Sequence, residues 1–410
     1  MKKQFLIFIF LVFVLFMFNK ILLRDFSTNT TVTTDDLLNK QKVTSQKLFE
    51  KNWRVIRDNF YDSKLNGQDW SYWKKHYAGK ILTDEDANVA INTMIESLDD
   101  PYSKYLDKKS YSEQTSSISS KITGIGVNIT EHSGKTLVVS VIEGTPAQKA
   151  GIKSGDLVVK VNGKDITGYK IEQVADIVRG PEGTSVQLTI LRKKKTLVKN
   201  IVRKEIKIKT VKSKILNDIG YIQILSFIGT TTSDEFLSAL DKTKDTKGLI
   251  IDLRGNAGGL LPNAVFISNL FISKGNIVSI VGRSGIKRNV YAQKNTSVID
   301  KPVLLLVDEG SASASEIFSG ALKDYHKATL VGTKTFGKGM VQKIIPMPNE
   351  TGLNLTIAKY LTPQGHDINK KGIEPDVVVK FTERDIKQKR DVQLNKAKIM
   401  MSEMIAQNKN

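Results

Sequence analysis

The sequence predicts an α+β protein of several domains: an N-terminal helical segment, a small β/α module, and an α/β core with a mixed sheet. Three observations predict this class. Apolar residues recur at helical spacing within 35–120. Short β-branched runs separated by Gly, Pro and Asn turns fill 124–205. Strand and helix patterns then alternate from Gly220 onward. A length of 410 residues fits two or three domains.

The chain begins with an apolar stretch, Phe5 to Leu23, behind Lys2 and Lys3. Its 19 residues are just enough to span a bilayer. No small-x-small cleavage site follows, which favours an uncleaved anchor over a signal peptide. We assign 1–24 to a signal peptide or membrane anchor, and we expect the body of the protein to lie outside the cytoplasm.

A linker and an N-terminal helical region are expected over 25–120. Ser27 to Thr34 is rich in Ser, Thr and Asn, as linkers are. Asp84 and Asp86 mark the start of a helix, because acidic side chains favour the first helical turn. Asp100-Pro101 ends the helical pattern.

A module of mixed strands and short helices is expected over 121–206. The strands are predicted at Thr136–Ile142, Asp156–Val161 and Ser185–Leu191, and the helices at Pro146–Ala150 and Ile171–Val178. Turns such as Asn162-Gly163 separate them.

The core is expected over 207–381, followed by a charged helical tail over 382–410. Strands are predicted at Tyr221–Leu225, Leu249–Leu253, Val303–Val307 and Ala328–Val331, with helices at Ser233–Lys242, Pro262–Phe271 and Ala314–Tyr325. This alternation predicts a sheet with some parallel strands.

The composition limits the kinds of functional site that the chain can form. The chain has no cysteine, and its four histidines are scattered, so we expect no metal site and no cofactor. The net charge is +20, and 192–214 holds eleven Lys or Arg against one Glu. Lysines on solvated edge strands explain that segment better than contact with an anionic polymer or lipid. Without a nucleic-acid-binding motif, we expect no nucleic-acid partner.

Gly310 to Glu316 is the first motif that could carry chemistry. It follows the apolar strand at Val303–Val307 and opens a helix. A serine at such a turn presents its hydroxyl beside the positive end of the helix, where a developing oxyanion is favoured. A small-residue loop with a serine N-cap is the alternative.

Lys338 lies between Gly337 and Gly339 in the second motif. Burial beside small residues and Phe336 would lower the pKa of its ammonium, and a neutral amine can accept a serine proton. A surface turn is one alternative. A phosphate-binding loop is another, but Gly339 stands where Ser or Thr is required and a strand pattern follows.

Asp252 to Leu260 is the third motif, at the end of a buried strand. Its glycines, Gly255, Gly258 and Gly259, expose backbone N–H groups. Such groups can form an oxyanion hole.

Together these motifs resemble the C-terminal processing proteases, also called tail-specific proteases. Lys338 follows Ser313 by 25 residues, and Gln342 comes four residues later. Ala257 stands where that family usually has proline. The resemblance runs from about Trp53 to Asp376 and includes Asp100-Pro101-Tyr102-Ser103 and Gly372-Ile373-Glu374-Pro375-Asp376.

The resemblance implies Ser313 as nucleophile, Lys338 as general base and Gln342 as the residue that orients the lysine. It implies an oxyanion hole made by the amides of Ala314 and of Gly258 or Gly259. The core would be a sandwich like those of the crotonase and ClpP folds. Ser311 and Ser315, which flank the nucleophile, serve as control residues.

The 121–206 module resembles a PDZ domain. The residues Gly124, Ile125, Gly126 and Val127 match the loop whose amides bind a terminal carboxylate. Val174 would line the groove for an apolar C-terminal side chain. Arg179 matches an arginine that couples peptide binding to catalysis in some relatives, although it could equally be a turn residue.

The function expected is therefore that of a serine endopeptidase that recognises C-terminal tails of protein substrates and cleaves through an acyl-enzyme. A catalytically silent PDZ scaffold and a serine esterase or amidase of the cell envelope are the alternatives. We expect a single-pass protein of a bacterial cell membrane, or a secreted one if 1–24 is cleaved. A homodimer through the terminal helices is also expected.

Overall fold

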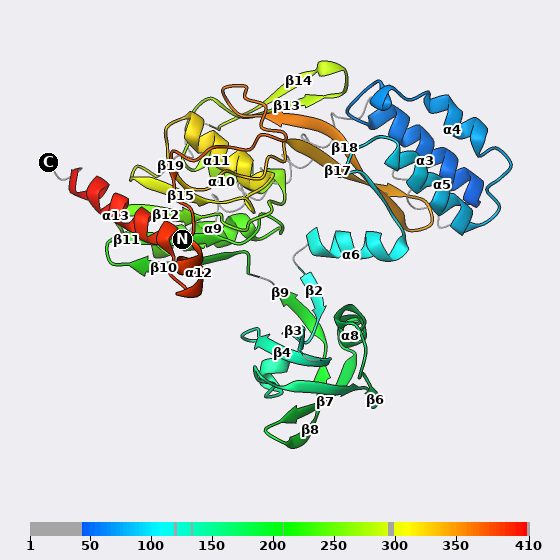
Figure 1. Cartoon of the computed structure of the whole chain (residues 1–410), viewed down its shortest axis with the longest axis horizontal. Helices are drawn as coiled ribbons and strands as arrows, with labels where there is room; N and C mark the ends of the chain where they lie inside the picture. Colours follow the sequence, from blue (N-terminus) through cyan, green and yellow to red (C-terminus); the bar gives the residue numbers. More distant parts are fainter. Residues whose placement is uncertain (1–42, 119–120, 133, 208, 294–298, 408–410) are drawn as a thin grey trace, which may run out of the picture. The chain divides into compact units, whose positions relative to one another are not determined.

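The computed structural model describes residues 43–118, 121–132, 134–207, 209–293 and 299–407. These fall into two compact units, a large one of residues 43–118, 209–293 and 299–407 and a small one of residues 121–132 and 134–207. Figure 1 shows the elements of each. The prediction of an α+β chain with a mixed sheet is confirmed.

The large unit is built on a six-stranded sheet. In spatial order the strands are β10 (Val211–Leu216), β11 (Ile219–Ile224), β12 (Gly248–Asp252), β15 (Val303–Val307), β16 (Thr329–Gly332) and β19 (Val377–Val378). Strand β10 is antiparallel to β11, and all the other neighbours are parallel. The predicted strand at Val303–Val307 is reproduced without change.

Both faces of this sheet are buried, because successive side chains of a strand point to opposite sides. Leu249, Ile251 and Leu305 belong to a core shared with α9 (Thr232–Lys242), α10 (Leu261–Asn269) and α11 (Ala314–Asp324). Ile250 and Leu304 pack instead with α13 (Val392–Gln407), which the short helix α12 (Glu383–Lys387) precedes. The central strands are therefore apolar without alternation.

A second sheet of the large unit is antiparallel. Its strands are β1 (Lys104–Leu106), β18 (Thr351–Leu361), β13 (Asn276–Gly282) and β14 (Lys287–Tyr291), and β17 (Met340–Met347) also pairs with β18. The sequence analysis recognised a strand pattern after Gly339, where β17 lies, but it missed β1, β13, β14 and β18. Strand β1 has three residues and β14 is mostly exposed, whereas the long strand β18 was overlooked although most of its residues are buried.

The N-terminal region adds helices to this second sheet. They are α3 (Ser45–Asn59), α4 (Trp70–His76), α5 (Asp84–Glu96) and α6 (Lys108–Ile118). Helix α5 begins as predicted: the Thr83 hydroxyl accepts from the Asp86 N–H, and the Asp86 carboxylate accepts from the Thr83 N–H. Buried residues of α3 and α5 join the core that holds the strands of both sheets.

The small unit contains a sheet in the order β3 (Val127–His132), β4 (Lys135–Val141), β5 (Leu157–Val161), β7 (Ser185–Arg192) and β8 (Lys195–Val202). The short strand β6 (Lys164–Asp165) pairs with β5, and β2 (Lys121–Gly124) pairs with β9 (Lys204–Lys207). Helices α7 (Pro146–Lys149) and α8 (Ile171–Val178) complete the unit, close to their predicted bounds.

The basic segment 192–214 is divided between surface and interior. Strands β8 and β10, which carry much of it, are outer strands of their sheets. Arg192 forms two hydrogen bonds with the Asp156 carboxylate. The buried Arg203 guanidinium donates to the carbonyls of Ile177 and Val178 and so caps the C-terminus of α8. Edge-strand solvation and local structural bonds account for these residues.

The predicted anchor, 1–24, lies outside the described residues. Within the part of the chain that the structure does describe, no helix combines the length and the apolar character needed to cross a bilayer.

An arginine joins the C-terminal segment to the parallel sheet. Arg254 lies just after β12, and its guanidinium binds both oxygens of Asp252 and both oxygens of Asp391. Tyr221 donates a 2.6 Å hydrogen bond to the same Asp252 carboxylate. Burial opposes the charge on Arg254, but the bonds to Asp391 and Asp252 outweigh it and raise the pKa of the guanidinium. The two acids therefore depend on this cation.

We expect Arg254→Leu to lower the free energy of unfolding by about 3–5 kcal/mol, because it leaves the buried Asp252 carboxylate without its cation. Chemical denaturation followed by circular dichroism measures the change. Lys247→Met is the matched control, because its ion pair with Asp218 is exposed and should contribute about 1 kcal/mol or less. Equal losses in the two variants would contradict the assigned role of Arg254.

Candidate active site

The three motifs meet because their strands are parallel neighbours. The glycine-rich loop follows β12, the serine loop follows β15, and the lysine loop follows β16. These strands pair in register, Leu249 with Val303 and Leu304 with Thr329. Since the carboxyl ends of parallel strands lie at one edge of the sheet, the three loops emerge together, at the edge where open α/β sheets bind ligands.

Ser313 occupies a strained turn at the start of α11. Its φ of 54° and ψ of −113° are rare for a residue with a side chain. Such strain at a strand-to-helix turn aims a serine hydroxyl outward. The turn is packed against Gly258, where an added Cβ would lie 2.9 Å from the Cβ of Ser313 and 2.6 Å from the Ala312 carbonyl oxygen. A glycine is therefore required at 258.

The neighbouring serines differ from Ser313 in what their hydroxyls do. Ser311 is fully buried and donates to the Leu253 carbonyl, and Ser315 is fully buried and donates to the Asn256 carbonyl. Ser313 is partly exposed, and none of the described residues forms a hydrogen bond with its Oγ. Of the three hydroxyls, that of Ser313 is the one available to a substrate.

A buried carboxylate ties the serine loop to the lysine loop. Glu316, in the first turn of α11, has an exposed fraction of 0%. One of its oxygens accepts from the N–H groups of Ser313 and Lys338, each at 2.9 Å. The other accepts from the Thr335 hydroxyl at 2.6 Å and the Gly337 N–H at 2.7 Å. Burial raises the pKa of Glu316, while these four donors oppose the shift.

A buried tyrosine makes a second tie between the same loops. The Tyr360 hydroxyl, on β18, lies 3.0 Å from the Ser313 carbonyl oxygen and 2.6 Å from the Lys338 carbonyl oxygen. Burial raises its pKa well above the ordinary value, so the hydroxyl keeps the proton that it donates. Sequence reasoning missed Tyr360, because nothing near it in the chain marks it. Glu316 was within a motif but had no role assigned.

The amine of Lys338 is partly buried, and burial favours the neutral form that can accept a proton. Burial lowers the pKa of its ammonium; the charge of Asp100 raises it and that of Lys104 lowers it further. The aromatic neighbour expected from the sequence, Phe336, is 58% exposed. The ring beside the amine is that of Tyr102, whose centroid lies 4.8 Å from Nζ. The expectation that Phe336 would help to bury the amine was wrong, because most of the Phe336 side chain is exposed to solvent.

Gln342 lies on β17, four residues after the lysine. Its Nε2 donates to the Thr356 hydroxyl of β18 at 3.4 Å, beside an irregularity in the pairing between Val341 and Gln342. That irregularity turns the start of β17 relative to the rest of the strand.

Backbone amides at the serine turn are candidates for binding an oxyanion. The Gly258 N–H already donates to the Asn256 side-chain oxygen at 2.9 Å. Among the described residues, the N–H groups of Gly259 and Ala314 have no acceptor. Hydrogen bonds between Phe227 and both Gly258 and Leu260 fix the backbone around Gly259.

The residues predicted to bind peptide all lie in the small unit. Ile125 is buried, and Gly126 has a φ of +84° and lies against Thr145. The N–H groups of Ile125 and Gly126 have no acceptor among the described residues. Val174 is fully buried in the core of the unit. Arg179 is exposed and caps α8 through its backbone.

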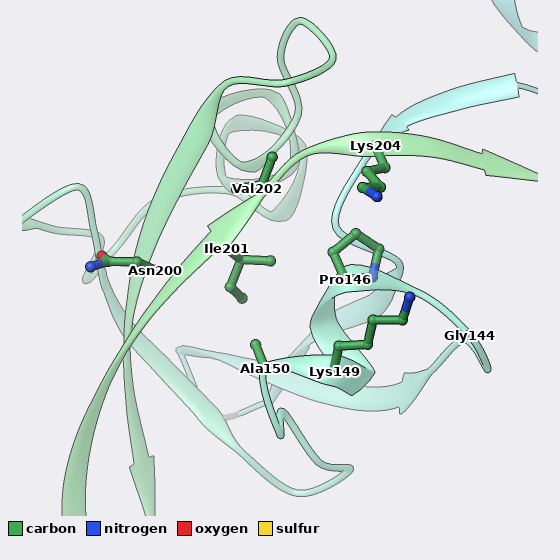
Figure 2. Close-up of a pocket in the computed structure, with 8 residues that line it drawn as sticks. All are labelled: Gly144, Pro146, Lys149, Ala150, Asn200, Ile201, Val202 and Lys204. Carbon is green, nitrogen blue, oxygen red and sulfur yellow. The ribbon is translucent and has the colours of Figure 1, made fainter.

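A cavity of about 290 Å³ lies elsewhere in the small unit. It is lined by Gly144, Pro146, Lys149, Ala150, Asn200, Ile201, Val202 and Lys204 (Figure 2). None of the predicted peptide-binding residues lines it.

Three family models match the chain. Peptidase family S41 matches residues 218–379, the PDZ domain matches 137–192, and the tricorn protease C1 domain matches 43–87. The first contains Ser313, Lys338 and Gln342, and the second lies within the small unit.

Curated relatives are similar to this chain over most of its length. The carboxy-terminal processing protease CtpA of Bacillus subtilis is 42% identical over 323 residues, which cover 77% of this chain and 69% of the relative. The carboxy-terminal-processing protease of Bartonella bacilliformis is 42% identical over 298 residues, covering 71% and 68%.

Solved structures have the same fold. The photosystem II D1 C-terminal processing protease is 29% identical with a TM-score of 0.57, over 82% of this chain and 93% of that one. A lipoprotein from Streptococcus agalactiae, at 13% identity and a TM-score of 0.55 over 89% and 98% of the two chains, resembles this protein in fold alone.

We expect Glu316→Gln to lower the free energy of unfolding by about 2–4 kcal/mol, because the amide nitrogen would face two of the four donors and leave them unsatisfied. Denaturation of the purified protein measures this loss. Glu374→Gln is the control, because Glu374 makes an exposed ion pair with Lys334. Unchanged stability in Glu316→Gln would show that Glu316 does not hold the two loops.

Proposed function

The chain belongs to peptidase family S41 and is a C-terminal processing serine peptidase, and from that premise we propose that it cleaves peptide bonds with a Ser313–Lys338 dyad. The observation that carries the proposal is the contrast among the three serines of the motif. Ser311 and Ser315 use their hydroxyls in buried bonds, whereas the Ser313 hydroxyl is accessible and has no partner among the described residues. An exposed, unpaired hydroxyl on a strained turn is what a nucleophile requires.

Lys338 is proposed as the general base. Burial lowers the pKa of its ammonium, which enlarges the neutral fraction that can accept a proton. The neutral amine takes the Ser313 proton as Oγ attacks the substrate carbonyl carbon. The resulting ammonium gives that proton to the leaving amine, and the peptide bond breaks to leave an acyl-enzyme. Water, deprotonated by Lys338, then hydrolyses the ester and restores Ser313.

Stabilisation of the oxyanion is assigned to backbone amides. The unpaired N–H groups of Ala314 and Gly259 are suited to the negative oxygen of the tetrahedral intermediate. Gly258 is the poorer candidate, because its N–H is already bonded to Asn256. Its proposed role is to let the glycine-rich loop approach Ser313. Gln342, anchored on Thr356, is proposed to orient Lys338.

Tail recognition is assigned to the PDZ domain. The unpaired amides of Ile125 and Gly126 would bind a terminal carboxylate, with Gly124 and Val127 setting the ends of the loop. The peptide would pair with β3 and lay its last apolar side chain against α8 above Val174. Arg179, exposed at the end of that helix, would signal occupancy to the protease core.

The location and the oligomeric state of the protein are also proposals. We propose a protein held at the membrane by 1–24, with its body outside the cytoplasm, and a homodimer through the terminal helices. A monomeric mass by light scattering would contradict the dimer.

We expect Ser313→Ala and Lys338→Met each to reduce cleavage of an unstructured protein by about 10³-fold or more, because each removes one member of the dyad. Rates are followed by mass spectrometry of the products. Ser402→Ala and Lys334→Met are the matched controls, since both side chains are exposed and their bonds are local or weak.

The outcomes separate the alternatives. Cleavage that survives Ser313→Ala would place the nucleophile elsewhere. Absent cleavage by the unaltered protein, with binding retained, would favour a scaffold. Hydrolysis of small esters or amides but not of proteins would favour an esterase or amidase.

Amidation of the substrate's C-terminus is expected to raise KM by about tenfold or more, because charge-assisted hydrogen bonds to the carboxylate are lost. Gly126→Ala should remove this difference, since its Cβ would lie 2.4 Å from Cβ of Thr145. Gly163→Ala is the control, because Gly163 has a similar φ of +77° but an added Cβ there meets no atom within 4 Å. Equal cleavage of both substrates by the unaltered protein would exclude carboxylate recognition.

A further inference from the structure

We propose that Tyr102 is a positioning residue for the base: its ring holds the side chain of Lys338 while the amine is charged and releases it when the amine is neutral. The inference rests on the proposed function, because it assumes that Lys338 is the base. It adds that the protonation state of Lys338 determines when the amine can reach Ser313.

The amine of Lys338 lies over the ring of Tyr102. Nζ of Lys338 lies 4.8 Å from the centroid of the Tyr102 ring. Among the described residues, no acceptor forms a hydrogen bond or ion pair with Nζ, and the Ser313 hydroxyl is not bonded to it. The amine therefore rests on an aromatic face and not on its proposed partner.

The ring is held in place by the turn that carries it. The Asp100 carboxylate accepts from the N–H of Ser103 at 3.1 Å and from its hydroxyl at 2.5 Å. The Ser103 hydroxyl in turn accepts from the N–H of Thr356 on β18 at 3.1 Å. Asn354, also on β18, donates to the Tyr102 carbonyl at 3.1 Å. Because both sides of the turn are bonded to the strand that pairs with β17, the backbone that carries the ring is fixed relative to that strand.

The strength of this contact depends on the proton. An aromatic face attracts a cation through its quadrupole, but it has no comparable attraction for a neutral amine. A charged Lys338 is thus retained on the ring, and loss of the proton frees the amine to reach Ser313. When the amine takes the serine proton it becomes a cation again, and the ring favours that product as well.

The other charged groups around the amine do not replace the ring. Asp100 raises the pKa of Lys338, and Lys104, on β1, lowers it. The Glu316 carboxylate is occupied by four donors, and the Tyr360 hydroxyl faces backbone oxygens. Burial raises the pKa of Tyr102 itself, so the ring stays a neutral phenol near pH 7.

The ring beside the proposed base comes from the N-terminal region. Tyr102 lies between α5 and β1, outside residues 218–379 that match the peptidase family. The N-terminal region therefore contributes directly to the state of the proposed base, and not only to the stability of the sheet.

The test is the dependence of kcat/KM on pH. We expect Tyr102→Leu to move the acid limb to lower pH by about half to one unit, because the cation loses its stabilisation. The activity of this variant relative to the unaltered protein should therefore rise about three- to tenfold from the plateau to the acid limb. A loss of packing alone would lower the rate equally at every pH.

Three variants make the result specific. Tyr102→Phe keeps the ring face and should keep the limb in place. Replacement of Tyr102 by trifluorophenylalanine keeps the shape but weakens the face, so it should move the limb down even if Tyr102→Leu folds poorly. Tyr72→Leu removes an exposed tyrosine that stacks on His76 and should leave the limb unchanged. A limb that stays in place in both Tyr102→Leu and the fluorinated variant overturns the proposal.

A second measurement tests the contact of Lys338 with Tyr102 independently of the proposed Ser313–Lys338 dyad. The Nζ resonance of ¹⁵N-labelled Lys338, assigned by its loss in Lys338→Met, is titrated in the unaltered protein and in the fluorinated variant. A downward shift of the Lys338 pKa in the variant supports the contact even if Ser313→Ala retains activity and the dyad fails. An unchanged pKa refutes the contact even if the dyad is upheld.

Discussion

One buried carboxylate holds the site together. Glu316 accepts four hydrogen bonds, two on each oxygen, and its donors come from the serine turn and from the loop that carries Lys338. A glutamine amide could not accept all four, because only its carbonyl oxygen is an acceptor. The parallel order of β12, β15 and β16 brings the loops to one edge of the sheet. Glu316 then fixes the residues within those loops relative to one another.

Ser313 is singled out by what surrounds it and not by its residue type. The run Ser311, Ser313, Ser315 alternates with alanine, and on the strained turn the two flanking hydroxyls point into the protein and bond to carbonyls of the glycine-rich loop. The flanking serines therefore join the glycine-rich loop to the serine loop, and this same pair of bonds fixes the turn that exposes Ser313. Structural and reactive roles are distributed over one short motif.

The N-terminal region is part of the proposed site. Its Asp100–Ser103 turn is bonded to β18, and β18 also provides Tyr360 and Thr356. The environment of Lys338 is thus built from three distant parts of the sequence: its own loop, the antiparallel sheet and the turn before β1.

The sequence by itself determined the α+β class, the strand Val303–Val307, a strand at Leu249–Leu253 that lies one residue from the observed Gly248–Asp252, the helix start at Asp84, and the family. Apolar periodicity, capping residues and motif spacing are local properties, which is why they could be read from the sequence. It also singled out Ser313 and Lys338 as candidates. Only the tertiary structure decided that the Tyr102 ring lies beside the lysine while Phe336 is largely exposed, and that Tyr360 joins the two loops. It also decided that the Gly258 N–H is already bonded, while that of Gly259 has no acceptor in the part of the chain that the structure describes. These facts depend on contacts between residues up to 236 positions apart, as for Tyr102 and Lys338, and no local pattern encodes which distant side chains will meet.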